Sequence, residues 1–250
     1  MNGLFKNIGL FLGVLFLSNC SSLAEPLAEL NIGNKYSETA DWLILESQTE
    51  APTTGIIFYP GALVDPHAYL SWLDKLINSN KKLLIVTVKM PANLAVLNSQ
   101  GGMKVIKNYP EITRWIVAGH SLGGTMAAQL ISKHPDKFKG LIFLASYPAN
   151  NTLKNWNGAI LSIHASNDGL STVSDIEKHK TDLSTATVMN SITDFHLPLQ
   201  NKTHYFEIMG GNHAQFGSYG VQKNDFVATI SKEDQQNQVI GIITHFIENL

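Results

Sequence analysis

Seven short apolar runs, separated by longer mixed segments, place the strongest constraint on how this 250-residue chain folds. They are strand-length and rich in β-branched or aromatic residues, and they cover residues 42–45, 55–59, 83–88, 115–118, 141–145, 159–163 and 204–209. The middle runs are apolar throughout, which is typical of parallel strands covered on both faces. Between them, apolar residues recur at helical spacing over 68–77, 122–133 and 236–249. This alternation predicts an α/β fold with a mostly parallel, twisted sheet and helices on both faces.

The composition narrows the possible functions. A net charge of −2 without a basic stripe argues against a nucleic-acid partner. The hydrophobic fraction of 44% is too high for a disordered chain. The single cysteine, Cys20, excludes an intramolecular disulfide and any metal site built from two or more thiolates.

The N-terminal residues read as a targeting signal. Lys6 precedes an apolar run of ten residues, 8–17, which is shorter than the roughly 20 residues that span a membrane. The run ends in Leu17-Ser-Asn-Cys20, which resembles the lipobox of bacterial lipoproteins, although Asn19 stands where that motif has a small residue. We therefore expect an exported protein of the bacterial cell envelope, held at the membrane by lipid on Cys20. The alternatives are a secreted or periplasmic protein and a signal anchor that is retained.

The strongest functional motif follows the run at 115–118. Gly119-x-Ser121-x-Gly123 has the spacing of a nucleophile elbow and stands between a predicted strand and a predicted helix. Such a tight turn needs neighbours without side chains, and it exposes the serine hydroxyl at a helix N-terminus. The backbone N–H groups there favour developing negative charge. Ser121 is therefore the candidate nucleophile.

An acid and a base are expected after later strands, because ligands of parallel sheets bind at the carboxyl ends of the strands. Asp168 follows the run at 159–163 and is the candidate acid, preferred over Asp175 and Asp194, which lie away from a strand end. His213 follows the last run in a glycine-rich loop and is the candidate base. His120, beside the serine, is interpreted as structural or pocket-lining.

Acyl transfer also needs N–H donors for the oxyanion. The backbone N–H of Leu122, next to the nucleophile, is the first candidate. The second is the N–H of Ala62, in the Pro60-Gly61 turn after the run at 55–59, although this turn has a purely structural interpretation as well.

Together these motifs resemble the α/β-hydrolase superfamily, and more narrowly a compact group of bacterial hydrolases. The resemblance runs from about residue 40 to the C-terminus. The matching stretches are Phe58-Tyr-Pro-Gly-Ala62, Val64-Asp-Pro, Ala68-Tyr69, Met90-Pro-Ala-Asn-Leu-Ala95, Gly119-His-Ser-Leu-Gly-Gly124, Ala145-Ser-Tyr-Pro-Ala149, Gly210-Gly-Asn-His-Ala-Gln-Phe-Gly217 and Tyr219-Gly220. The resemblance implies Ser121, Asp168 and His213 as a catalytic triad, with no metal and no organic cofactor.

We accordingly expect three parts: a signal peptide at 1–19, a lipid-anchored tether and entry segment at 20–40, and one α/β-hydrolase domain at 41–250. About a dozen residues separate Ala145 from Ala159, which leaves no room for a cap domain. The open site suits small or short-chain carboxylic esters, cleaved through an acyl-enzyme, although residues 182–202 could form a small flap. The alternatives are a membrane-tethered lipid or thioester hydrolase and, in a different class, a non-catalytic binding protein with this fold.

Overall fold

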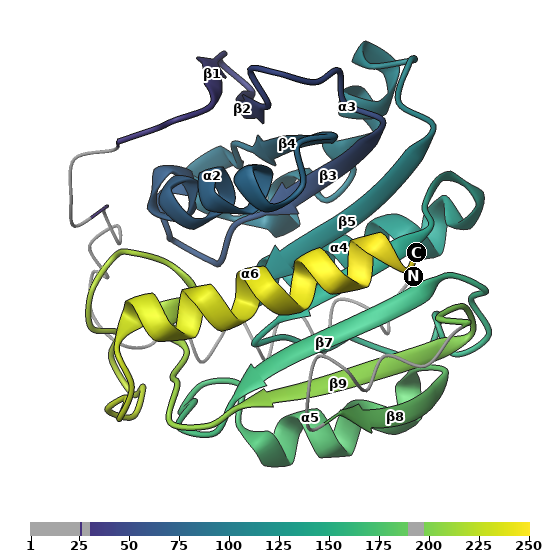
Figure 1. Ribbon diagram of the computed structural model, residues 1–250. Coiled ribbons are helices and arrows are strands. Elements are labelled where there is room, and N and C mark those ends of the chain that lie inside the picture. Colours follow the sequence, from purple (N-terminus) through teal and green to yellow (C-terminus); the bar gives the residue numbers. More distant parts are fainter. Residues whose placement is uncertain (1–25, 27–30, 190–197) are drawn as a thin grey trace.

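A nine-stranded sheet forms the centre of the molecule, in a computed structural model that describes residues 26, 31–189 and 198–250 (Figure 1). The strand order is β1-β2-β4-β3-β5-β6-β7-β9-β8, and all pairs are parallel except those of β2 with β1 and β4. The strands are β1 Lys35–Glu38, β2 Trp42–Glu46, β3 Thr54–Tyr59, β4 Leu83–Val88, β5 Arg114–His120, β6 Gly140–Leu144, β7 Ala159–Ala165, β8 Thr185–Met189 and β9 Lys202–Ile208. The predicted fold class is confirmed.

The helices cover both faces of the sheet. On one face, α2 (Leu70–Ser79) lies beside α6 (Lys232–Glu248), which crosses the front of the molecule in yellow in Figure 1. On the other face lie α3 (Gly102–Asn108), α4 (Leu122–Lys133) and α5 (Val173–His179).

Alternate residues of the central strands belong to two separate apolar cores, one on each face of the sheet. Ile56 and Phe58 of β3 pack with α2 and α6, whereas Ile57 and Tyr59 pack with α3 and α4. All four side chains are buried, because neighbouring residues of a strand point to opposite faces. A strand buried on both faces has no polar position, which explains why these runs are apolar throughout.

The edges of the sheet differ from the sequence-based expectation. β1 pairs with β2, so the sheet begins at Lys35, within the range predicted as the tether and entry segment rather than at residue 41. At the other edge, residues 185–189 form β8 rather than part of a flap. Both strands are largely exposed, so neither carries the apolar run that identified the central strands.

The connection from β6 to β7, residues 145–158, contains no helix or strand, so no cap domain is built from this connection. The predicted signal peptide, Cys20 and residues 190–197 of the predicted flap lie outside the described residues. In the part of the chain that the structure describes, no helix is long and apolar enough to span a membrane.

Two buried tyrosines give a test of the packing. The Tyr59 hydroxyl donates to Ser99 O at 2.9 Å and accepts from Gly102 N at 2.9 Å, whereas the Tyr205 hydroxyl is buried without a partner among the described residues. We expect Tyr59→Phe to lower the free energy of unfolding by about 1–3 kcal/mol, because it leaves two backbone groups unpaired. Tyr205→Phe should leave stability unchanged or raise it. Urea unfolding of both variants checks the contrast, and equal losses would contradict it.

Candidate active site

Ser121 occupies a sharp turn between β5 and α4. Its backbone has φ 52° and ψ −127°, a region that residues with a side chain rarely adopt. The turn is possible because two glycines flank it at close range. A Cβ on Gly119 would lie 2.5 Å from Gly123 C, and a Cβ on Gly123 would lie 2.2 Å from Tyr59 O. The predicted elbow geometry is therefore present.

Hydrogen bonds from the neighbouring strand hold this turn. Ser121 N donates to Leu144 O at 2.9 Å, and Ser146 Oγ donates to Ser121 O at 2.6 Å. Both partners come from the end of β6 or just beyond it. The Ser121 hydroxyl itself has no hydrogen-bond partner among the described residues, so it is free to rotate.

Asp168 lies in the loop after β7 with its side chain fully buried. Its Oδ2 lies 2.8 Å from His213 Nδ1, and its Oδ1 accepts from Leu170 N and Ser171 N, each at 2.7 Å. These contacts fix both carboxylate oxygens. Asp175 instead completes a capping box with Thr172 at the start of α5, and Asp194 lies outside the described residues.

His213 lies in the loop after β9 and is also buried. Because a carboxylate only accepts hydrogen bonds, the proton lies on Nδ1 and leaves Nε2 as the basic nitrogen. The His213 ring lies 4.5 Å from the ring of His120, the residue that immediately precedes Ser121. Within the described chain, no hydrogen bond joins His213 to Ser121 Oγ, a contact that in hydrolases without substrate is often long.

Two glutamines of α6 hold the His213 loop through hydrogen bonds to its backbone. Gln235 accepts from Asn212 N at 2.9 Å and donates to Asn212 O at 2.8 Å, so its amide pairs with both backbone groups of that residue. Gln236 donates to Gly217 O at 3.1 Å. Both glutamines are buried, and the sequence analysis missed them. The sequence feature that could have identified them is a pair of polar residues directly before the apolar stripe of the C-terminal helix.

The loop after β3 presents the second candidate oxyanion donor. Gly61 N donates to the Tyr69 hydroxyl at 3.0 Å, and Leu63 N donates to Asn93 O at 2.8 Å. Between them, Ala62 N has no acceptor among the described residues, and neither has Leu122 N at the start of α4. Both predicted donors are therefore unengaged.

His120 is tied to this loop through Tyr69. The Tyr69 hydroxyl accepts from Gly61 N, so it donates its proton to His120 Nδ1, 2.9 Å away. Burial lowers the pKa of His120 well below its usual value, and the nearby His213 adds to the shift while the His213 backbone partly opposes it. His120 is therefore neutral, with its proton on Nε2. It joins the loop after β3 to the nucleophile turn, which supports its structural interpretation.

Backbone strain concentrates at this end of the sheet. Leu63, Ala92, Asn93, Ser121 and Ala145 all have positive φ, and each follows the end of a central strand. Residues held in such conformations cost about 1–3 kcal/mol each and cluster at functional sites. The strain therefore marks the same edge as Ser121, Asp168 and His213.

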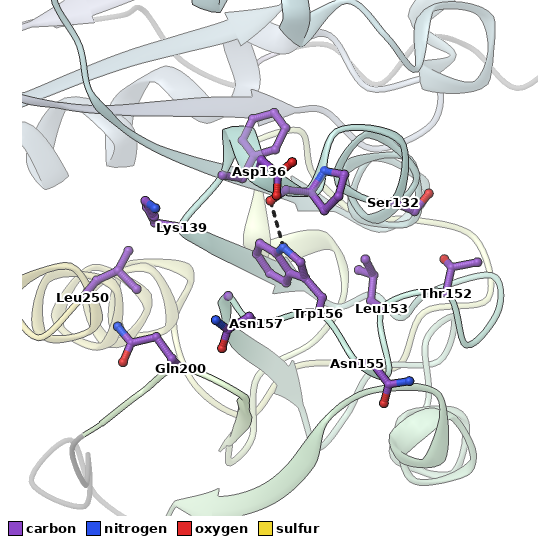
Figure 2. A pocket seen from close by; sticks show the side chains of 13 residues that line it. Ser132, Asp136, Lys139, Thr152, Leu153, Asn155, Trp156, Asn157, Gln200 and Leu250 are labelled. Atoms are coloured by element: carbon purple, nitrogen blue, oxygen red, sulfur yellow. Dashed lines mark hydrogen bonds between the residues drawn. The ribbon is translucent and has the colours of Figure 1, made fainter.

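A cavity of about 850 Å³ lies at the opposite end of β6 and β7 (Figure 2). Trp156, Asp136, Lys139 and Leu250 are among its lining residues, and Trp156 Nε1 donates to Pro135 O at 3.1 Å. None of the predicted site residues lines this cavity. Among the described residues, no group of three His, Cys, Asp or Glu side chains could hold a metal ion.

Comparison with known protein families finds a family model that matches much of the chain. Residues 55–237, more than half of the chain, match the model of a family described as the alpha/beta hydrolase family. No curated protein matches the sequence.

Three solved structures with the same fold are similar to this chain over most of its length. A predicted CIB-like hydrolase from Thermoplasma acidophilum has a TM-score of 0.61 and 12% identity, covering 88% of this chain and 99% of its own. TT1662 from Thermus thermophilus has a TM-score of 0.61 and 11% identity, covering 87% and 99%. Est1E from Butyrivibrio proteoclasticus has a TM-score of 0.59 and 11% identity, covering 86% and 99%. At these identities the likeness shows the fold alone.

A pair of glycine substitutions tests the close approach at the turn. Gly123→Ala would place a methyl group 2.2 Å from Tyr59 O, so we expect it to lower stability by about 1–3 kcal/mol or more. Gly241→Ala is the matched control, because its Cβ meets nothing within 4 Å inside α6. It should raise stability by about 0.5–1 kcal/mol through helix propensity. Thermal unfolding of the two variants measures both changes in stability. If Gly123→Ala left stability unchanged, α4 could move away from the end of β3 without cost, and the close approach would not be required.

Proposed function

The chain belongs to the alpha/beta hydrolase family, and on this premise we propose that it is a serine hydrolase of carboxylic esters, with Ser121, Asp168 and His213 as its catalytic triad. The observation that carries the proposal is the buried 2.8 Å contact between Asp168 and His213, placed beside the strained serine turn. A buried acid–histidine pair next to an unpartnered serine hydroxyl has the arrangement that activates a serine nucleophile.

Catalysis begins when the Ser121 hydroxyl rotates toward His213 Nε2. His213 takes the proton as Ser121 Oγ attacks the ester carbonyl, and Asp168 keeps the imidazole in the required tautomer and stabilises its cationic form. The carbonyl oxygen becomes an oxyanion, which accepts hydrogen bonds from the free N–H groups of Leu122 and Ala62. When the tetrahedral intermediate collapses, His213 protonates the leaving alcohol and an acyl ester remains on Ser121.

Deacylation repeats these steps with water as the nucleophile. His213 removes a proton from water, the hydroxide adds to the acyl carbonyl, and the carboxylic acid leaves as the proton returns to Ser121. The neutral state of His120 helps at both stages. Its ring lies 4.5 Å from that of His213, and a second positive charge there would oppose formation of the imidazolium.

A fluorophosphonate probe tests the nucleophile directly. We expect it to label the wild-type chain at Ser121 and to leave Ser121→Ala unlabelled, with kcat for ester hydrolysis falling by about 10⁴- to 10⁶-fold. Ser132→Ala is the control, because the Ser132 hydroxyl only donates to a carbonyl of its own helix, Gln129 O. Labelling that survives Ser121→Ala would refute the assignment. No labelling of the wild type would favour the non-catalytic binding protein.

The open end of the sheet supports small substrates. The connection that follows β6, residues 145–158, contains no helix or strand that could form a deep channel for a long acyl chain. One observation favours the second candidate, a lipid or thioester hydrolase acting at a membrane surface. Four of the exposed large apolar side chains lie on the loops around His213, namely Met209, Val221, Phe226 and Val227.

A series of p-nitrophenyl esters of increasing acyl length separates these two candidates. We expect kcat/KM to be highest for acetate and butyrate and to fall with longer chains, because the open site gives a long chain little apolar surface to bury. A preference for long chains, lost when Phe226 and Val227 are both changed to Ser, would instead identify the lipid hydrolase. Equal rates at all lengths would defeat the open-site argument.

A further inference from the structure

The carboxylate of Asp225 bridges the two loops that carry the acid and the base. Its Oδ1 accepts from Gly169 N at 3.1 Å and from His213 N at 3.3 Å, and its Oδ2 accepts from Ala214 N at 2.9 Å. Gly169 directly follows Asp168, so one side chain contacts the backbone on both sides of the Asp168–His213 hydrogen bond. Only a carboxylate offers enough acceptor sites to receive N–H groups from these separate directions.

The residues around Asp225 strengthen this bridge. We call residues 224–227 the clasp. Asn212 Nδ2 donates to Phe226 O at 2.8 Å from the base loop, and Asn167 Nδ2 donates to Val227 O at 3.0 Å from the acid loop. The clasp therefore receives hydrogen bonds from the side chains immediately before Asp168 and before His213, as well as from the backbone beside both residues.

The acid loop approaches the clasp closely. A Cβ on Gly169 would lie 2.2 Å from Asn224 O, so the residue after Asp168 packs directly on the clasp backbone. Asn224 itself has φ 68°, a conformation that asparagine tolerates better than most residues. The position of the clasp thus depends on the acid loop, and Asp225 transmits that position to His213.

We propose that Asp225 is a positioning residue, which sets the distance and orientation of His213 relative to Asp168 and so keeps Nε2 directed toward Ser121. This inference rests on the proposed function, because it assigns Asp225 a role in the same reaction. Without the carboxylate, the N–H groups of His213 and Ala214 lose their acceptor and the base loop gains freedom. Displacement of a catalytic group by about 1 Å reduces rates by about 100-fold.

The first test is Asp225→Asn in the full chain. The amide keeps the size of the side chain, but its NH₂ group faces backbone N–H donors on one side. We expect kcat to fall by about 10- to 100-fold while KM changes less than about threefold, because His213 acts on the chemical step. If this variant does not fold, Gly169→Ala displaces the clasp from the acid side and should give the same split between kcat and KM.

Asp74→Asn is the matched control. Asp74, a buried carboxylate where Asp225 is half-buried, likewise holds a distant loop by its backbone N–H groups, accepting from Gly33 N and Asn34 N at 3.0 Å each. It lies in α2, and among the described residues its side chain accepts hydrogen bonds from Gly33 and Asn34 and from neither the acid loop nor the base loop. This variant should lower the unfolding midpoint about as much as Asp225→Asn does, yet leave kcat unchanged. An equal loss of kcat in both variants would mean that Asp225 acts through general stability.

A double-mutant cycle shows whether Asp225 acts through His213. In the His213→Ala background, adding Asp225→Asn should cause no further loss of activity, since the group that it positions is already absent. A further 10- to 100-fold loss there would overturn the proposal, as would full kcat in Asp225→Asn alone.

An NMR measurement separates this inference from the proposed function. The proton between His213 Nδ1 and Asp168 is expected to give a low-field resonance that is identified by its absence in His213→Ala. Asp225→Asn should shift or broaden it, and Asp74→Asn should leave it in place. If wild type neither hydrolyses esters nor reacts with the probe, the proposed function fails while this resonance still decides the role of Asp225. A resonance unaffected by Asp225→Asn would refute that role.

Discussion

The strained backbone at Ser121 is the constraint on which the rest of the site depends. Its φ of 52° and ψ of −127° cost about 1–3 kcal/mol, and the turn persists because its surroundings determine it. Leu144 O accepts the Ser121 N–H, and Ser146 supplies a hydrogen bond to the Ser121 carbonyl. Gly123 lets α4 approach the end of β3 within van der Waals distance. Ser121 therefore lies in the turn between β5 and α4, and the free N–H of Leu122 is next to it at the start of the helix. A serine that continued the strand or the helix would have a different backbone conformation.

Strand order brings the remaining groups to this turn. β5, β6, β7 and β9 are parallel neighbours, so the loops that follow them meet at one edge of the sheet. Asp168 and His213 come from the adjacent strands β7 and β9, although 45 residues separate them in the chain. The loops are then fixed from outside the sheet by side chains of other elements: Gln235 of α6 holds the residue before His213. The site is therefore a product of a rigid sheet and of loops anchored at several points.

Much of the fold was predictable because its determinants are local. Continuous apolar runs identified the seven central strands, and helical periodicity identified the segments that became α2, α4 and α6. The exposed edge strands β1 and β8 were missed, because a strand that buries little apolar surface has no such signature. The same limit applies to Gln235 and Tyr69. Their roles depend on partners 23 and 51 residues away, and neither residue type indicates such a partner by itself.

The sequence alone therefore determined the central strands, the helices α2, α4 and α6, and the candidate groups, since glycine spacing, apolar periodicity and residue chemistry are read within a few positions. It identified Ser121, Asp168 and His213 as candidates from their places after strands. Only the tertiary structure decided how these places relate. It paired Asp168 with His213 at 2.8 Å, tied neutral His120 to the Gly61 loop through Tyr69, and set Asp225 against both the acid and base loops. These contacts join residues far apart in the chain, and they exist only once the sheet has set the strand ends side by side.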